Sequence, residues 1–114
     1  MIELYHWWHC TTGRQPTVLI EDKGSGSALI QTLRYRSIYP YEVLPVGDKV
    51  MRMSAQTPTI ENREVFLPLR APWLDTFRTE VLAFPHGVHD DQVDSMSQAL
   101  NHLAHGPSFG AIAV

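Results

Sequence analysis

Three aspartates at the start of one predicted helix are the residues of this chain best suited to do chemistry. Asp90, Asp91 and Asp94 follow a turn that contains proline and glycine, and they open an amphipathic segment that extends to Leu103. At about 100° per residue, Asp90 and Asp94 lie one helical turn apart, beside the apolar stripe of that helix. Clustered carboxylates are the ligands that hard divalent cations require. A structural role is the alternative, in which Asp90 caps the helix and Asp91 faces its positive end.

A second pair of carboxylates, Glu21 and Asp22, ends a short apolar run that is rich in β-branched residues. The run covers residues 17–22 and is bounded by Pro16 and Gly24. This pattern is typical of a strand that is buried on both faces, as in a parallel or mixed sheet. In open α/β sheets the ligand crevice lies beyond the carboxyl ends of the strands. Acidic residues also end strands for purely structural reasons, and the local pattern favours neither interpretation.

The two acidic groups, about 70 residues apart in the sequence, could form one site. A compact α/β core with its strand-end loops on one edge would bring Glu21 close to Asp90. Mg²⁺ bound by few carboxylates keeps coordination positions for substrate phosphates. Two such ions can hold the attacking water and the leaving oxygen of a phosphodiester. Because packed carboxylates repel one another, we expect this site to be weakly ordered without metal.

Basic side chains near these carboxylates could bind phosphates. Lys49 and Arg52 share one face of a predicted helix, and Lys23 is a possible third member of the group. Next to an acidic metal site these residues would neutralise phosphate charges. The alternative is an ordinary solvated helix face, which the number of basic residues alone favours.

Composition and charge limit the possible functions. With 114 residues the chain forms one domain at most, and its 44% hydrophobic and 18% charged content indicates an ordinary globular protein. A net charge of −3 excludes a generally basic nucleic-acid binder but leaves room for a local basic groove. The single cysteine, Cys10, allows no internal disulfide, as expected in a reducing compartment. No apolar run approaches the ~20 residues that cross a bilayer, and the first residues lack signal-peptide features.

The elements expected to position these residues alternate between strand and helix. Residues 1–10 fit a helix and a strand equally well. The glycine-rich turn 23–27, in which Ser25 or Ser27 serves as a cap, leads into a helix over residues 28–36. Together with the preceding strand, this helix predicts half of a βαβ unit.

The second half of the chain predicts further strands and helices. A helix that starts at Lys49 is expected to end near Ala55, before Pro58. The helix opened by Pro72 has Glu80 on its polar face. The remaining expected elements are strands at 42–46 and 64–68 and the acidic helix that ends near 103.

Segments along the chain occur in a specific order. They are VLIEDKGSG (18–26), LIQ (29–31), LR (33–34), GDKV (47–50), Arg52, EVFLP (64–68), PWL (72–74), FP (84–85) and HDDQVD (89–94). In this order and spacing they resemble the C-terminal nuclease domain of bacteriophage terminase large subunits. The resemblance spans roughly residues 16 to 103, which is nearly the whole chain.

The resemblance implies a fold, an activity and a set of partners. It implies a ribonuclease H-like domain that cuts concatemeric viral DNA with two Mg²⁺ or Mn²⁺ ions during genome packaging. Metal-ligand and catalytic roles fall on Glu21, Asp90 and Asp91, with Asp22 and Asp94 as second choices. The implied partners are double-stranded DNA and, in the parent protein, an ATPase domain, the small terminase subunit and the portal. The implied location is the cytoplasm of the bacterial host, with no membrane association.

The chain also departs from the family pattern. It lacks the Walker motifs of the ATPase domain, and Glu3 is the only acidic residue that precedes Glu21. We therefore expect a partial domain over residues 1–105, with an incomplete mixed sheet flanked by helices, and a flexible tail over 106–114. Endonuclease activity is expected of the parent protein, whereas activity of this chain alone stays open.

Two other functions compete with the nuclease hypothesis. One is a catalytically inactive remnant that acts only in protein–protein association, through an exposed sheet edge near Trp7 and Trp8. The other is a zinc-binding module, although the spacing matches no closed four-ligand pattern. Its candidate ligands are His6, His9 and Cys10 with either His86 and His89 or His102 and His105.

Overall fold

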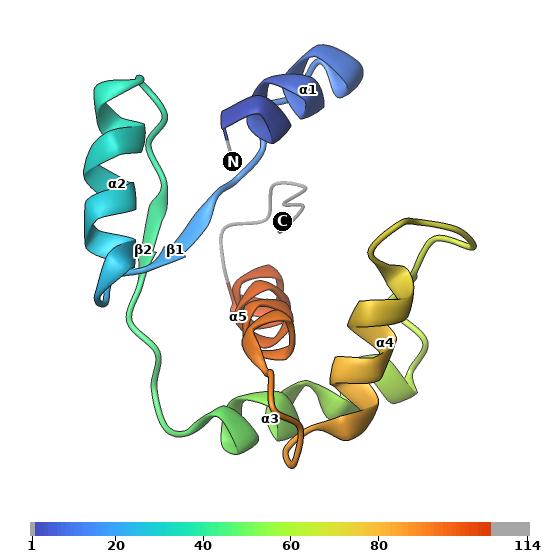
Figure 1. The fold of residues 1–114 in the computed structure, drawn as a ribbon. Helices are drawn as coiled ribbons and strands as arrows, with labels where there is room; N and C mark the ends of the chain where they lie inside the picture. Colours follow the sequence, from blue (N-terminus) through green and yellow to red (C-terminus); the bar gives the residue numbers. More distant parts are fainter. Residues whose placement is uncertain (1, 106–114) are drawn as a thin grey trace. The chain divides into compact units, whose positions relative to one another are not determined.

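The computed structural model describes residues 2–105, which divide into two compact units. The first unit contains residues 2–45 with His105, and the second contains residues 46–104. The tail expected at 106–114 lies outside the described residues. The elements, in chain order, are α1 (Ile2–Thr12), β1 (Leu19–Glu21), α2 (Ser25–Tyr35), β2 (Tyr41–Val43), α3 (Lys49–Glu61), α4 (Leu74–Ala83) and α5 (Asp91–His105) (Figure 1).

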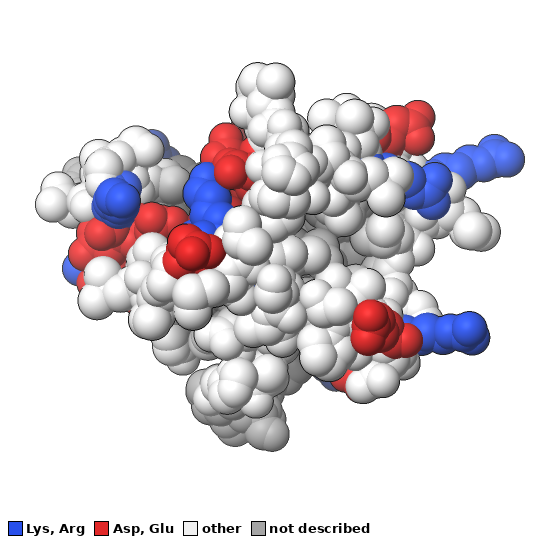
Figure 2. Space-filling view, turned by 90° about the horizontal axis from the view of Figure 1, so that it is seen from below, with Lys and Arg blue, Asp and Glu red and all other residues white. Residues whose placement is uncertain are grey.

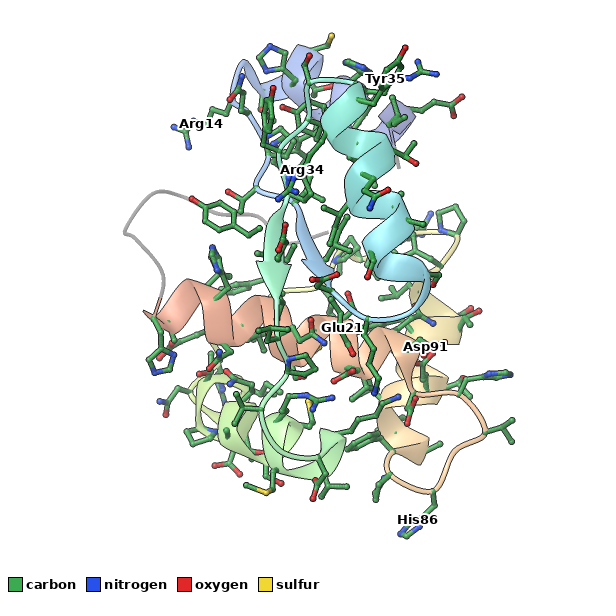
Figure 3. The ribbon with its side chains drawn as sticks, turned by 90° about the vertical axis from the view of Figure 1, so that its left-hand side faces the viewer. Arg14, Glu21, Arg34, Tyr35, His86 and Asp91 are labelled. Carbon is green, nitrogen blue, oxygen red and sulfur yellow. The ribbon has the colours of Figure 1, made fainter. Side chains whose placement is uncertain are left out.

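The first unit is built on a βαβ arrangement. Strands β1 and β2 pair in parallel, with Ile20 opposite Glu42, and α2 connects them (Figure 1). The predicted strand within residues 17–22 is therefore confirmed, and Glu21 is its last residue. The predicted strand at 42–46 is also present, but it covers only Tyr41–Val43. Arg34 of α2 forms an ion pair with Glu42, which ties the helix to β2 (Figure 3).

A small apolar core lies between α2 and the two strands. Ile20, Ile30, Leu33 and Ile38 are buried together, and Leu33 is fully inaccessible to solvent. Ile30 and Leu33 lie three positions apart, so they share one face of α2. The first ten residues, for which sequence left helix and strand open, form most of α1. Its partly buried residues Ile2 and Tyr5, again three apart, pack against the core.

Helix α2 begins without a serine cap. Its N-cap is Gly24, in the left-handed region at φ 57°, and no side chain caps the helix there. The Ser27 hydroxyl instead donates a hydrogen bond to Asp22 Oδ1 at 2.6 Å. The predicted cap by Ser25 or Ser27 is therefore wrong. Gly26 is needed for packing, because a Cβ at this position would lie 1.9 Å from the backbone oxygen of Glu21.

Helix α3 in the second unit starts where the sequence predicts and ends later. The Asp48 side chain caps it by accepting a hydrogen bond from the Met51 amide at 2.8 Å. The helix then continues through Pro58 to Glu61, so the break expected before Pro58 is wrong. Proline lacks an amide donor and its ring crowds the carbonyl of the preceding turn, but the next turn still forms, with the Asn62 amide donating to the Pro58 carbonyl at 2.9 Å.

The predicted strand at 64–68 is also wrong. Within residues 2–105, β1 and β2 are the only strands, and they form a two-stranded parallel sheet. Phe66 is 87% exposed and Leu67 is 44% exposed, which agrees with the lack of a neighbouring strand that would cover this segment. Residues with strand propensity form a strand only when a partner completes the hydrogen-bond ladder, and none does so here.

Helices α4 and α5 complete the second unit. Helix α4 begins at Leu74 with Trp73 as its N-cap, so a helix is present as predicted but the placement of Pro72 in its first turn is wrong. Leu74 and Val93 are buried at the start of their helices, and the rest of the α5 stripe is partly buried up to the exposed Leu103. None of the helices in the described part of the chain is long and apolar enough to cross a membrane.

Candidate functional site

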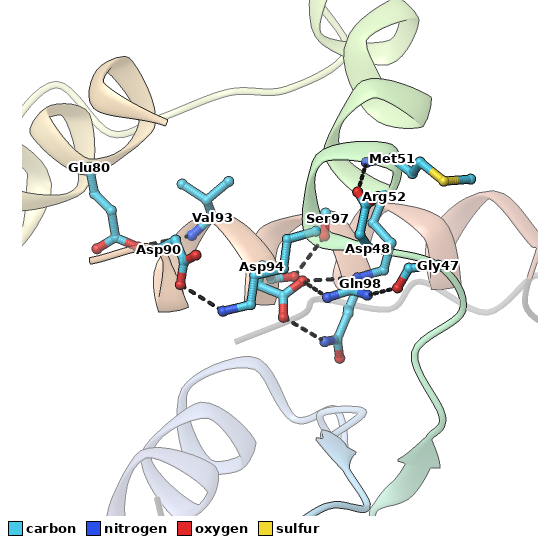
Figure 4. A network of polar contacts seen from close by, with 11 residues as sticks. Gly47, Asp48, Met51, Arg52, Glu80, Asp90, Val93, Asp94, Ser97 and Gln98 are labelled. Carbon is cyan, nitrogen blue, oxygen red and sulfur yellow. Dashed lines mark hydrogen bonds and ion pairs between the residues drawn. The ribbon is translucent and has the colours of Figure 1, made fainter. Parts of the chain in front are cut away.

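The first turn of α5 is held by a carboxylate from another helix. Glu80, which is buried in α4, accepts a hydrogen bond at Oε1 from the Gln92 amide at 2.6 Å. The same oxygen accepts a hydrogen bond from the Val93 amide at 3.2 Å (Figure 4). Glu80 Oε2 accepts a third from the Gln92 side-chain amide at 2.8 Å. The backbone amides of Gln92 and Val93 are donors that an N-cap would otherwise satisfy, and the negative charge of Glu80 faces the positive end of α5. Glu80 therefore takes the capping role that the structural interpretation gave to Asp90.

Sequence reasoning missed Glu80 and placed it on the solvent face of α4, which is wrong. Glu80 is 8% exposed. Residues three and four positions after Phe77 lie on the same side of the helix as Phe77. Glu80 is the first of these and Val81 the second, so Glu80 lies at the edge of the apolar stripe. The spacing from Phe77 was the signal in the sequence that could have indicated burial of Glu80. A carboxylate is buried only when hydrogen-bond donors pair with it, and here those donors come from α5, which the local sequence does not reveal.

The side chain of Asp90 is bound to a lysine. Lys49, the first residue of α3, donates from Nζ to Asp90 Oδ1 at 2.7 Å, while the Asp90 backbone oxygen accepts the first helical hydrogen bond from Asp94 (Figure 4). The two side chains are 42% and 37% exposed, so this ion pair is open to water. The hydrogen bond to Asp90 raises the pKa of Lys49 above its ordinary 10.5, helped by the nearby Asp94 and Asp91 charges, while burial works in the opposite direction.

The second ion pair is more enclosed. Arg52 donates to Asp94 Oδ1 from Nε at 3.0 Å and from Nη2 at 2.7 Å, and its Nη1 donates to the Gly47 carbonyl at 2.7 Å. The side chains of Arg52 and Asp94 are only 16% and 10% exposed. Gln98 adds a longer contact to the other carboxylate oxygen, at 3.4 Å. This pair joins α3 to α5 and fixes the helix that carries the aspartates.

The remaining predicted residues lie at exposed or half-exposed positions. Asp91 is exposed as the first residue of α5, and Glu21 is partly buried at the end of β1 (Figure 3). Asp22 and Lys23 are exposed just after β1. Glu21 belongs to the first unit and the aspartates of α5 to the second, so their meeting around one ion stays a prediction.

The donor groups near α5 offer a divalent cation few protein ligands. Among residues 2–105, no three His, Cys, Asp or Glu side chains are gathered into a group that could hold a metal ion, and this includes the histidines of the zinc hypothesis. Asp90 and Asp91 do fit the chemistry of Mg²⁺ or Mn²⁺, since both are solvent-accessible carboxylates and such ions bind through one or two carboxylates plus water or phosphate. Asp94 is already paired with Arg52 in an ion pair. The face drawn in Figure 2 carries both acidic and basic side chains.

Comparison with known proteins places the chain in a family. A family of terminase RNaseH-like domains matches residues 3–103, which is most of the chain and includes every residue of the site described above. Two further comparisons, with curated proteins and with solved structures, found no match to the chain. The chain therefore belongs to the terminase RNaseH-like domain family.

Proposed function

We propose that this chain is part of the nuclease domain of a phage terminase large subunit, which cuts concatemeric viral DNA by metal-dependent phosphodiester hydrolysis. The observation that carries this proposal is the family match over residues 3–103. The half-exposed Asp90 and the exposed Asp91 at the first turn of α5 support it, because accessible carboxylates are what such chemistry needs. The parent protein would act in the cytoplasm of the bacterial host, with an ATPase domain, the small terminase subunit and the portal.

Glu21, Asp90 and Asp91 are the residues proposed to hold Mg²⁺ or Mn²⁺. When bound, the ions would stabilise charge on the phosphodiester and lower the pKa of an attacking water. The chain's own residues would position these ligands. Glu80 holds the amides of the first turn of α5, which orients the backbone that carries Asp91.

The proposed ligands of second choice, Asp22 and Asp94, differ in their surroundings. Asp22 is exposed and accepts a hydrogen bond from Ser27. Asp94 is buried and paired with Arg52, so a cation would have to displace a guanidinium to reach it. We propose that Asp94 supports the site by holding α5 against α3.

We propose that two of the basic residues, Lys23 and Lys49, contact DNA phosphates. Lys23, at an exposed position after β1, and Lys49, 42% exposed at the start of α3, can reach a phosphate in solvent. Arg52 was predicted as a phosphate contact together with Lys49, but its three hydrogen bonds within the protein favour a structural role instead. An overall charge of −3 makes such binding local and dependent on ionic strength.

A paramagnetic titration tests the shared metal site. Mn²⁺ is added to the ¹⁵N-labelled chain, and amide signals near the ion are expected to broaden both around Glu21 and around Asp90. Asp90→Asn should weaken Mn²⁺ binding by about tenfold or more, because it removes one charged ligand. Asp75→Asn, an exposed carboxylate in α4, is the matched control and should change nothing.

Two results would contradict the proposal. Broadening at only one of the two positions would show that Glu21 and Asp90 do not share an ion. Broadening that persists in Asp90→Asn would remove this residue from the ligand set. In the full parent protein, Asp90→Ala should abolish DNA cleavage and retain ATPase activity.

A further inference from the structure

The two basic residues of α3 are bound to the aspartates in different ways. Arg52 makes three hydrogen bonds to Asp94 and Gly47, with its side chain 16% exposed. Lys49 makes one, to Asp90, and its side chain is 42% exposed. Arginine in a buried, multiply bonded pair is costly to displace, whereas a lysine in an open ion pair with a single bond is not. Of the two cations, Lys49 is the one that can leave.

We propose that the Lys49 ammonium serves as an internal counter-ion that neutralises Asp90 until a divalent cation replaces it, and that the released lysine then binds a phosphate of the DNA. This inference rests on the proposed function and assigns Lys49 two alternating partners. The ion pair in Figure 4 is the first of the two states.

The charges around the first turn of α5 favour such an exchange. Asp90, Asp91 and Asp94 contribute three negative charges, and the buried Glu80 contributes a fourth. Lys49 and Arg52 contribute two positive charges, so two negative charges are left in the metal-free state. A divalent cation in place of the ammonium would reduce this excess to one negative charge, and it would bind carboxylate oxygen more strongly than a monovalent ammonium does at the same separation.

The backbone allows the lysine to move without disturbing the helix. Lys49 is the first residue of α3, and the neighbouring Asp48 fixes that helix end through the Met51 amide. The four-carbon stem of lysine is flexible, so its ammonium can swing while the backbone stays in place. A lysine released into solvent next to a metal site is suitably placed to meet the phosphate that the metal attracts.

The exchange is tested by calorimetric titration of Mg²⁺ into the chain and its variants. Lys49→Met is expected to bind Mg²⁺ about three- to tenfold more tightly, because the competing ammonium is gone. Arg78→Met, an exposed residue of α4 in the same unit, is the control for the loss of one positive charge and should leave Mg²⁺ affinity within about twofold. Lys49→Gln, which keeps a polar side chain, should behave like Lys49→Met and guards against an effect of the apolar substitution.

Two further measurements follow the released lysine. In the wild-type chain the ¹³Cε signal of Lys49 should shift on addition of Mg²⁺, which reports directly on loss of the ion pair. In DNA binding, Lys49→Met should weaken affinity for a short duplex only when a divalent cation is present, and Ca²⁺ is the cation used to avoid cleavage. The slope of log affinity against log salt concentration should then decrease by about one, because one contact to a phosphate is lost.

The outcomes separate this inference from the proposed function. If the wild-type chain binds Mg²⁺ and Asp90→Asn does not, but Lys49→Met binds it with unchanged or weaker affinity, the exchange is refuted and the metal site stands. If neither the wild type nor Lys49→Met binds Mg²⁺, both fail. If only Lys49→Met binds it, the lysine blocks the site in this chain and the counter-ion role is supported.

Discussion

Removal of the Glu80 carboxylate should loosen the helix that carries the candidate ligands. Glu80→Ala deletes three hydrogen bonds, of which those to the Gln92 and Val93 amides lie at the positive end of α5. Loss of a helix cap costs about 0.5–2 kcal/mol, and a buried amide left without a partner costs about 1–3 kcal/mol. Val93 is only 1% exposed, so water cannot replace the lost acceptor there. We expect the free energy of unfolding to fall by about 2–4 kcal/mol.

Glu80→Gln separates hydrogen bonding from charge. Its amide oxygen can still accept from the backbone of α5, so it should lose only about 1 kcal/mol, the contribution of the negative charge near the helix end. Glu64→Ala, an exposed acid outside any helix, is the control and should change stability by less than about 0.5 kcal/mol.

The assay combines urea denaturation with hydrogen exchange at single amides. A loss of 2 kcal/mol corresponds to about thirtyfold faster exchange, and we expect it at the Val93 amide of Glu80→Ala. Exchange at Val93 within about threefold of the wild type, or equal losses in Glu80→Ala and Glu80→Gln, would refute the reasoning.

Three further predictions follow from other contacts. Arg52→Met should destabilise the chain by about 3 kcal/mol in urea denaturation, since it leaves the buried Asp94 carboxylate unpaired; a loss below about 1 kcal/mol would contradict a structural role. Gly26→Ala should destabilise the first unit by about 3 kcal/mol, because the new Cβ would lie 1.9 Å from the Glu21 carbonyl oxygen; amide exchange should rise in residues 2–45 and not in 46–104. The ¹³Cε signal of Lys49 should titrate above pH 10.5, so the stability from its ion pair is present below that pH and lost as pH rises through the raised pKa; a midpoint at or below 10.5 would contradict it.

The parts of the fold that could be predicted from sequence are those set by neighbouring residues. The β-branched run before Glu21 forms a strand, and Asp48 starts a helix by capping it. One failure concerns a feature that depends on a distant partner, because residues 64–68 have strand propensity but no neighbouring strand in the described part of the chain. The other failure is local, because α3 continues past Pro58 and the turn after the proline keeps its own hydrogen bonds.

The candidate site shows the same division. The sequence by itself indicated the family, which the match over residues 3–103 confirms, because residue types and their spacing along the chain carry that information. The metal-ligand roles of Glu21, Asp90 and Asp91 stay a prediction. Only the tertiary structure decided what each side chain of α5 binds. Lys49 meets Asp90 across 41 positions and Arg52 meets Asp94 across 42, and buried Glu80 caps a helix that begins after it in the chain. Such pairings arise from helix packing, which brings together residues that no local pattern connects.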